Sequence, residues 1–181
     1  MNALEARAWL ALKQVTDPEI PVVSIAELGI LRSVHALGDG SVQVNITPTY
    51  SGCPAMGQIA DDVRTALQAA GLQGSVNTLL APAWTTDWMS ASAHEKLRAY
   101  GIAPPHSVAP GAAQVIRFAT KKVAANEYSI SHSGGFHAAG VACPQCQSRN
   151  TTETSHFGST ACKALYKCLD CLEPFDYFKP Y

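Results

Sequence analysis

Charged residues are scarce in this chain of 181 residues, and long hydrophobic runs are absent. Lysine, arginine, aspartate and glutamate together make up 15% of the sequence, and the formal net charge is −1. A nearly neutral chain has no overall field that attracts nucleic acid or an anionic membrane surface. No apolar run reaches the roughly 18 residues that a membrane-spanning helix needs. We therefore expect a protein that binds neither nucleic acid nor membrane.

A secretory signal is also missing, because Met1 to Leu12 contain no basic segment followed by an apolar one. We accordingly expect a cytoplasmic protein whose six cysteines stay reduced. In a reducing compartment, C-x-x-C pairs indicate metal binding or redox chemistry more than a disulfide framework.

Four of the six cysteines form two C-x-x-C pairs near the end of the chain, Cys143 with Cys146 and Cys168 with Cys171. Two such pairs suit four thiolates arranged tetrahedrally around one zinc ion, and the sequence between them is long enough for a hairpin. Four thiolates also accept iron or an iron–sulfur cluster, so the spacing leaves the metal open. Unrelated buried cysteines and a disulfide framework are the alternatives.

The segment 143–181 is too short to bury enough apolar area to fold alone, so we expect the metal to supply the missing free energy. Cys162 is the one cysteine of this segment outside both pairs. Cys162 could serve as a spare ligand, a reactive thiol or a packing residue, and we favour a role without metal binding. Residues 106–142 are rich in Ala, Gly, Ser and Pro and predict a linker. The predicted organisation is a domain over 1–105, this linker, and a four-cysteine zinc-ribbon-like domain over 143–181.

The first 105 residues alternate helical and strand patterns. Helices are predicted for Leu4–Val15 and for a segment that starts at Pro54 and stops at Gly71. A third helix is predicted to begin with a capping box at 92–95 and to end near Tyr100. Strands are predicted for Ile30–Leu37, Ser41–Thr47 and Ser75–Leu80. The expected fold class is α/β (α+β), with a small mixed sheet and helices on one side.

Cys53 precedes Pro54, which fits the first position of a helix. A thiol at the N-cap would face free backbone N–H groups and the positive end of the helix dipole, which favour the thiolate. The alternative is a buried cysteine that serves as a small apolar residue.

Two tryptophans, Trp84 and Trp88, lie close together in a segment that the pattern predicts to be a loop. They form either part of the core or an exposed apolar surface for a partner protein.

Several stretches together resemble known families. The sequences D-P-E-I-P at 17–21, A-E-L-G-I at 26–30 and T-P-T-Y-S-G-C-P at 47–54 are similar to the small α/β domain of iron–sulfur assembly factors, which include SufT-type proteins. The sequences P-A-W-T-T-D-W-M at 82–89, F-G-S-T-A-C-K-A-L-Y at 157–166 and E-P-F-D-Y-F-K at 173–179 resemble the PaaD-type proteins of phenylacetyl-CoA epoxidase systems. The resemblance covers nearly the whole chain except the predicted linker.

This resemblance implies an accessory or maturation subunit in aerobic phenylacetate degradation, where a di-iron oxygenase and a flavin/iron–sulfur reductase epoxidise the ring. Its expected partners are the other epoxidase subunits and an iron–sulfur or di-iron client protein. Cys53 matches the family's cysteine before proline, and Asp17 and Glu19 match its acidic loop. Cys143, Cys146, Cys168 and Cys171 match the metal ligands of the tail.

Catalysis by this chain alone is not expected. A di-iron oxygenase needs two Glu-x-x-His motifs and two further glutamates in a helical bundle, whereas Glu153 to His156 is the single match here. A docking subunit without a role in metal handling is the main alternative function. A nucleic-acid-binding ribbon is a third, but segment 143–181 balances four basic residues against four acidic ones: Arg149, Lys163, Lys167 and Lys179 against Glu153, Asp170, Glu173 and Asp176.

Overall fold

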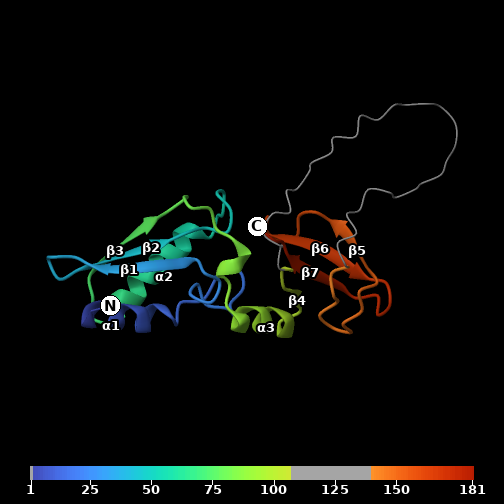
Figure 1. The fold of residues 1–181 in the computed structure, drawn as a ribbon, viewed down its shortest axis with the longest axis horizontal. Coiled ribbons are helices and arrows are strands. Elements are labelled where there is room, and N and C mark those ends of the chain that lie inside the picture. Colours follow the sequence, from blue (N-terminus) through green and yellow to red (C-terminus); the bar gives the residue numbers. More distant parts are fainter. Residues whose placement is uncertain (1, 107–139) are drawn as a thin grey trace, which may run out of the picture.

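The computed structural model describes residues 2–106 and 140–181, which form two small sheets with helix α3 between them (Figure 1). Most of the predicted linker, residues 107–139, lies outside the described residues. The mixed α+β class predicted from the sequence is confirmed.

The first sheet contains β1 (Leu31–Ala36), β2 (Val42–Ile46) and β3 (Gly74–Thr78) in the order β1-β2-β3. Strands β1 and β2 are antiparallel, and a hairpin turn joins them with Gly40 at a φ of 83°. Glycine adopts this left-handed conformation without steric cost. Strand β3 runs parallel to β2, so the chain must cross over between them.

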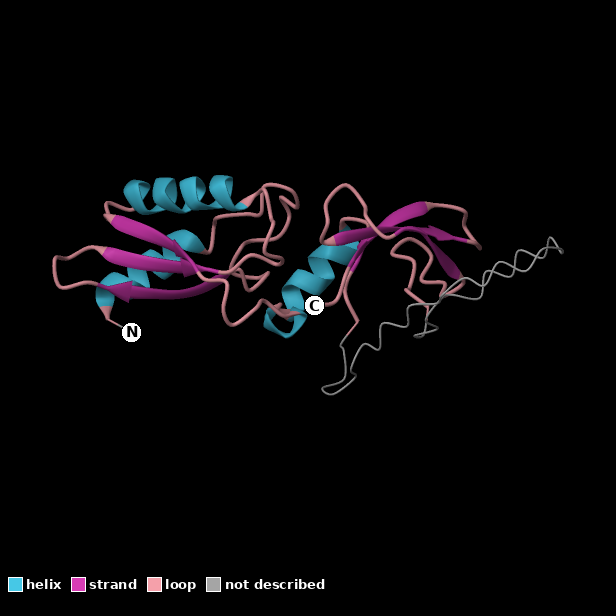
Figure 2. Ribbon diagram, turned by 90° about the horizontal axis from the view of Figure 1, so that it is seen from above, coloured by secondary structure: helices cyan, strands magenta, loops and turns pink. Residues whose placement is uncertain are grey.

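Helix α2 (Met56–Ala69) makes that crossover and lies along the three-stranded sheet (Figure 2). Its buried residues Ile59, Val63 and Leu67 recur at helical spacing and face the core. As predicted, the helix stops at Gly71, which has a φ of 68°. The Leu72 N–H then bonds back to the Leu67 carbonyl at 2.9 Å, which satisfies one of the free carbonyls at the helix end.

Helix α1 (Ala3–Leu12) begins at Asn2, whose side chain and Glu5 form a capping box. The helix ends three residues before the predicted Val15. Val15 instead pairs with the following loop, because its carbonyl accepts the Ile25 N–H at 2.9 Å. The β-bridge between Thr16 and Ser24 continues this pairing.

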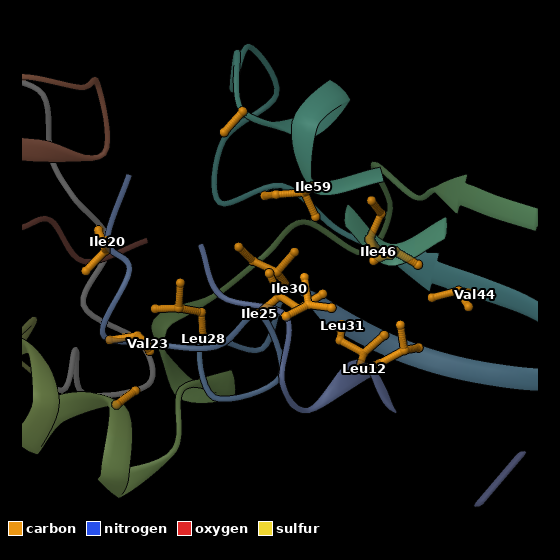
Figure 3. Close-up of a cluster of buried hydrophobic side chains, with 14 of the residues drawn as sticks. Leu12, Ile20, Val23, Ile25, Leu28, Ile30, Leu31, Val44, Ile46 and Ile59 are labelled. Carbon is orange, nitrogen blue, oxygen red and sulfur yellow. The ribbon is translucent and has the colours of Figure 1, made fainter. Parts of the chain in front are cut away.

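The main core lies between α1, α2, the sheet and the loop that follows α1 (Figure 3). Fully buried side chains from all four meet there: Leu12, Val23, Ile25, Leu28, Val42, Val44, Ile46, Ile59, Val63 and Leu67. The loop over residues 17–30 therefore contributes to the core although it contains neither helix nor strand.

Helix α3 (Ala91–Ala99) follows the short 3-10 helix η1 (Thr86–Trp88). The capping box predicted at 92–95 is wrong, since the N-cap is Ser90, whose side chain accepts the Ala93 N–H at 3.1 Å. The hydroxyl of Ser92 instead donates to Glu27 at 2.8 Å.

The second sheet has the order β4-β7-β6-β5, with β5 (Thr151–Ser155), β6 (Lys163–Cys168) and β7 (Pro174–Phe178) forming an antiparallel ribbon. Strands β5 and β6 are the predicted hairpin between the cysteine pairs. The short strand β4 (Ile102–Ala103) comes from the first part of the chain and runs parallel to β7. The division into 1–105 and 143–181 stays a prediction, and secondary structure crosses it.

Core packing crosses the same boundary at a junction where the C-terminus meets η1. Phe178 and Cys162 belong to the core cluster of the first part of the chain, not to that of the ribbon. Trp84 lies there too: its indole N–H donates to the Leu28 carbonyl at 3.0 Å, and its ring centroid is 6.0 Å from that of Phe178. Trp84 is only 4% exposed, so of the two alternatives for this residue the structure supports core packing and not an exposed partner surface.

Candidate metal centre and thiol site

The two C-x-x-C pairs fold into the same tight turn. In each turn the N–H of the first cysteine bonds to the carbonyl five residues later, from Cys143 to Ser148 at 2.9 Å and from Cys168 to Glu173 at 3.0 Å. The residue that follows the second cysteine has a positive φ in both turns, 62° at Gln147 and 66° at Leu172. This shared geometry directs both sulfurs of each pair to the same side.

The four cysteine sulfurs meet between the two turns, where all of them lie within 4.8 Å of one another. The Sγ atoms of Cys143 and Cys171 are 3.7 Å apart, and those of Cys146 and Cys168 are 3.5 Å apart. Four thiolates at the usual Zn–S bond length of about 2.3 Å would be separated by about 3.8 Å. The donor set therefore fits one tetrahedral metal ion.

Polar contacts hold the two turns against each other. Asp170 accepts hydrogen bonds from the Ser148 hydroxyl and, at 2.7 Å, from the Asn150 side chain. The N–H of Cys171 lies 3.5 Å from the Cys168 sulfur and, with the Asp170 N–H, lowers the pKa of that thiol to about 7. Backbone N–H groups of this kind stabilise a thiolate before and after a metal binds.

Cys53 does not occupy the predicted N-cap of α2. That position belongs to Ala55, because Cys53 and Pro54 form a turn before the helix begins. Cys53 is half-buried, and this burial raises the pKa of its thiol although the Ala55 N–H opposes the shift. The stabilised thiolate expected from the sequence is therefore not supported.

The acidic loop that precedes Ile20 is held together by one of its own carboxylates. Asp17 is buried, and its Oδ1 accepts the N–H groups of Glu19 and Ile20, each at 2.9 Å. Burial raises the pKa of Asp17, while these two N–H groups oppose the shift. Asp17 thus shapes the loop, whereas Glu19 is half-buried and has no ion-pair partner among the described residues.

The structure brings the turn that contains Cys162 to this loop, although the sequence separates the two by more than a hundred residues. Cys162 is buried, its sulfur lies 3.0 Å from the Thr160 hydroxyl, and burial raises its pKa. The charges of Glu19 and Asp17 raise that pKa further. Sequence spacing offered no signal for this meeting, because it depends on how the ribbon docks.

Two polar residues hold the turn of Cys162 in place at the junction. Lys163 is buried next to Cys162, and its Nζ is 3.3 Å from a carboxylate oxygen of Asp176. The hydroxyl of Tyr181 donates to the Ala161 carbonyl at 3.2 Å, which fixes the C-terminal residue to the same turn. The sequence offered no reason to select either residue.

A second cluster that the sequence did not reveal surrounds Glu27. Its carboxylate accepts hydrogen bonds from Lys96 at 2.9 Å and from Ser24 at 3.0 Å, so it ties α3 to the loop over 17–30. Burial alone would raise the pKa of Glu27, but these bonds outweigh it and lower the pKa to about 2.

The backbone at Gly29 passes close to Trp88. Gly29 has a φ of 73°, and a Cβ at this position would lie 2.6 Å from Trp88, so a larger residue would not fit.

Trp88 remains a candidate for contact with a partner, because it is half-buried. The Arg32 guanidinium carbon lies 3.3 Å from the centroid of its ring, which is a cation–π arrangement. Glu153 and His156, the single Glu-x-x-His match, form an exposed pair 3.2 Å apart on the β5 hairpin.

Two family models match the chain. Residues 5–78 match the family described as iron–sulfur cluster assembly protein, and residues 129–179 match the family described as PaaD zinc beta ribbon domain. The first range includes the acidic loop and Cys53, and the second includes all four clustered cysteines and Cys162.

Relatives with known names agree with both matches. The chain is 45% identical over 173 residues to the putative D subunit of the 1,2-phenylacetyl-CoA epoxidase of Escherichia coli, with 94% of this chain and 90% of that protein covered. It is 38% identical over 84 residues to an Fe-S protein maturation auxiliary factor of Porphyromonas gingivalis, with 45% and 79% covered. The factor SufT of Staphylococcus aureus is 38% identical over 78 residues, with 42% and 88% covered.

Proposed function

This chain belongs to the PaaD family of phenylacetyl-CoA epoxidase proteins, and from this membership we propose that it is an accessory subunit that helps to assemble a metal centre of the epoxidase. Its client is an iron–sulfur or di-iron subunit of the same enzyme system. The chain itself performs no step of the epoxidation.

The observation that carries this proposal is the combination of two parts in one chain. The region similar to iron–sulfur assembly proteins contains a half-buried thiol, Cys53. The ribbon similar to the PaaD family docks directly onto that domain through β4 and Phe178. The region similar to iron–sulfur assembly proteins and the ribbon of the PaaD type are thus in contact within one chain. This arrangement suits delivery of metal to one particular client protein.

The four ribbon cysteines hold a structural metal ion in this proposal. Four sulfurs leave no open coordination position, which is typical of structural zinc and unsuited to transfer. Cys143, Cys146, Cys168 and Cys171 would bind zinc, and the ion would supply the folding free energy that a ribbon of this size lacks.

Cys53 is the thiol that takes part in metal handling, and Glu19 is the neighbouring carboxylate. The thiol is protonated when free, because burial raises its pKa. A metal ion replaces the proton of a thiol when it binds, so a raised pKa lowers the apparent affinity at neutral pH without preventing binding.

Replacement of Cys53 by alanine tests this function. Wild type and Cys53→Ala are expressed at equal levels with the epoxidase subunits, and the iron content of the partner subunits and the oxygenase activity are measured. We expect the variant to keep its fold and its ribbon metal but to lower both partner iron and activity. Ser51→Ala, which changes an exposed neighbour, is the matched control. Equal iron and equal activity in Cys53→Ala would contradict the proposal.

A docking subunit without metal handling is the second candidate function. The half-buried position and raised pKa of Cys53 favour it, because both also fit a cysteine that only packs. The two functions differ in when the chain is needed. A docking subunit is required throughout turnover, so its removal from the assembled complex would abolish activity. An assembly factor is needed beforehand, so a complex that has already been loaded would stay active without it.

A further inference from the structure

A cavity of about 530 Å³ lies where α3 and the residues after β4 face the ribbon (Figure 1). Its volume falls within the range of roughly 300–1,000 Å³ that is typical of small-molecule sites. Four of its lining side chains are basic: His94, Arg98, His106 and Arg149. None of the described residues that line it is acidic. Basic side chains are thus concentrated in this cavity, although the net charge of the chain is −1.

The first part of the chain supplies three of these side chains. His94 and Arg98 are four residues apart on α3, so they share one face of the helix. His106 follows β4, and its Nδ1 atom lies 3.2 Å from the hydroxyl of Tyr177 on β7. This contact fixes the imidazole ring and leaves its Nε2 atom available to a ligand.

The ribbon supplies the fourth side chain, Arg149, which follows the first cysteine turn. That turn packs directly against the first part of the chain, because Ala103 of β4 and Cys143 belong to the same buried cluster. The Gln145 side chain also approaches Gly101, where a Cβ would lie 3.9 Å from its nitrogen. The cavity therefore exists because the ribbon docks onto α3 and β4.

The basic groups of the cavity repel one another and have no counter-ion in the described part of the chain. Arg98 and Arg149 are exposed, and neither forms an ion pair there. Burial and the charge of Arg98 lower the pKa of His94, while burial and the charge of Arg149 lower the pKa of His106. A bound anion would relieve this repulsion.

A phosphate group matches these side chains better than a carboxylate does. An arginine guanidinium binds phosphate through two parallel N–H···O bonds, and one arginine already satisfies a carboxylate in the same way. Two arginines from different segments can instead bind separate oxygens of one phosphate, or the two halves of a diphosphate. Neutral imidazoles add one N–H donor each.

We propose that this cavity binds a small molecule that carries a phosphate or diphosphate group, with Arg98 and Arg149 as its anchors and His94 and His106 as further hydrogen-bond donors. The site is separate from Cys53 and from the four ribbon sulfurs, so it adds a ligand to the function proposed above. Because its side chains come from both parts of the chain, the ligand would also stabilise their docking.

The sequence of residues 107–139, which connects the two sides of the cavity, offers no substitute for such an anion. This stretch contains three lysine or arginine residues and one glutamate: Arg117, Lys121, Lys122 and Glu127. Its net charge has the same sign as the cavity. A separate molecule is therefore the better source of the missing negative charge.

Calorimetry with two probes tests the site. Full-length protein with zinc in the ribbon is titrated with inorganic pyrophosphate and with ADP, in a phosphate-free buffer of low ionic strength, and metal analysis confirms that the zinc remains. We expect one molecule to bind per chain and adenosine, which lacks phosphate, not to bind. Tighter binding of ADP than of pyrophosphate would assign the site to an organic phosphate, and equal binding would assign it to the inorganic anion.

Substitution of the two arginines tests which residues hold the anion. Arg98→Gln and Arg149→Gln should each weaken binding about tenfold or more, because each removes a charge-assisted hydrogen bond. Both side chains are exposed, so the melting temperature without ligand should stay close to that of wild type. Arg64→Gln is the matched control, since it removes an exposed arginine from α2, outside the cavity.

Three results would overturn the inference. The first is that wild type binds neither probe. The second is that Arg64→Gln weakens binding as much as Arg149→Gln, which would indicate attraction to overall charge alone. The third is that amide NMR shifts on ligand addition lie away from α3, residues 102–106 and the first cysteine turn.

The same variants distinguish an anion site from charge balance at the metal centre. A divalent ion with four thiolates carries excess negative charge, which a nearby arginine could offset. If Arg149→Gln speeds loss of zinc to a chelator while wild type binds neither probe, the arginine serves the metal centre and the anion site is wrong. Client iron in Cys53→Ala is independent of these measurements, so the proposed function can fail without this site, and the reverse.

Discussion

The first domain and the ribbon are stabilised by different means. The first domain buries large aliphatic side chains from three helices, two strands and a long loop. The cluster of the ribbon is small and includes two of its own cysteines: Ala103, Val141, Cys143, Ala164, Cys168, Phe175 and Tyr177. Apolar burial contributes roughly 25 cal/mol per Å², so this term is larger in the first domain, and we predict that a bound metal supplies what the ribbon lacks.

At the junction, each part of the chain contributes residues to the sheet or core of the other. The ribbon obtains β4 from the first part of the chain as the edge strand beside β7. The first domain obtains Phe178 and Cys162 from the ribbon as part of its core. Loss of metal should therefore reach beyond the ribbon, and the following predictions test how far.

The largest effect is expected from loss of the ribbon metal. Structural zinc contributes about 10–16 kcal/mol in comparable modules, so Cys143→Ser or removal of the ion by a chelator should unfold residues 143–181. Trp84 packs against Phe178 at 6.0 Å, so its fluorescence should change as the ribbon detaches.

Metal analysis, tryptophan fluorescence and amide NMR check this prediction. The signals of α1, α2 and the first sheet should persist, while those of the junction disappear. Ser51→Ala serves as the control, because it changes an exposed side chain outside the ribbon centre. Unchanged metal content in Cys143→Ser would refute the four-cysteine assignment.

A smaller effect is expected from breaking the junction while the metal stays bound. Phe178 is 1% exposed, and its replacement by alanine should lower the free energy of unfolding by about 3–5 kcal/mol. Phe157→Ala is the control, since Phe157 is 64% exposed. Denaturant unfolding measures both changes, and metal analysis confirms that the ribbon ion remains. Equal stability of the two variants would show that the two parts fold independently.

Much of this architecture was predictable, because it depends on local patterns. The alternation in β2, the stripe of Ile59, Val63 and Leu67, and the two C-x-x-C turns are each determined by residues close together in sequence. Their hydrophobic periodicity and turn residues hardly depend on the rest of the chain. These elements were predicted with small errors in their bounds.

The junction was not predictable, since it depends on contacts between distant segments. Strand β4 has two residues and exists because β7 lies beside it. Trp84 packs against Phe178 and Tyr181, which are distant from it in sequence. Cys53 was placed at or beside a helix N-cap on a local rule, but the helix begins later.

A contact within the first part of the chain should have a more modest effect, and it depends on pH. The folded pKa of Glu27, about 2, lies below the ordinary value of 4.5. A carboxylate with a lowered pKa stabilises the fold above its unfolded pKa, and this contribution is lost as pH falls from about 4.5 towards 2. Glu27→Gln should therefore cost about 1–2 kcal/mol at pH 7, after allowance for partial exposure, and much less at pH 2.

Comparison of Glu27→Gln with wild type at each pH isolates the contribution of Glu27 to the free energy of unfolding, because acid release of the ribbon metal affects both proteins alike. Glu95→Gln removes an exposed carboxylate from helix α3, which Glu27 contacts, and provides the control. Thermal unfolding between pH 2 and pH 7 gives the difference. A Glu27→Gln penalty that stays constant across this range would rule out the lowered pKa as its cause.

The smallest effect on stability is expected at Trp88, where the first domain still offers a partly exposed aromatic side chain. Trp84 is buried and Trp88 is half-buried, so substitution of each in turn compares a core tryptophan with a candidate contact for a partner. Trp84→Ala should cost about 3–5 kcal/mol, as expected for a large buried side chain. Trp88→Ala should cost about 1 kcal/mol or less, mainly through loss of the cation–π contact with Arg32.

Association distinguishes the two substitutions further, because exposed tryptophans often dominate the binding energy of protein interfaces. We expect Trp88→Ala to weaken binding to the oxygenase subunits in a pull-down or by calorimetry, while its melting temperature stays close to that of wild type. Arg32→Gln removes the cation–π contact but keeps the indole, so it should retain more of the binding than Trp88→Ala. A large loss of stability in Trp88→Ala, or unchanged binding, would assign Trp88 to packing and leave the docking surface to the ribbon.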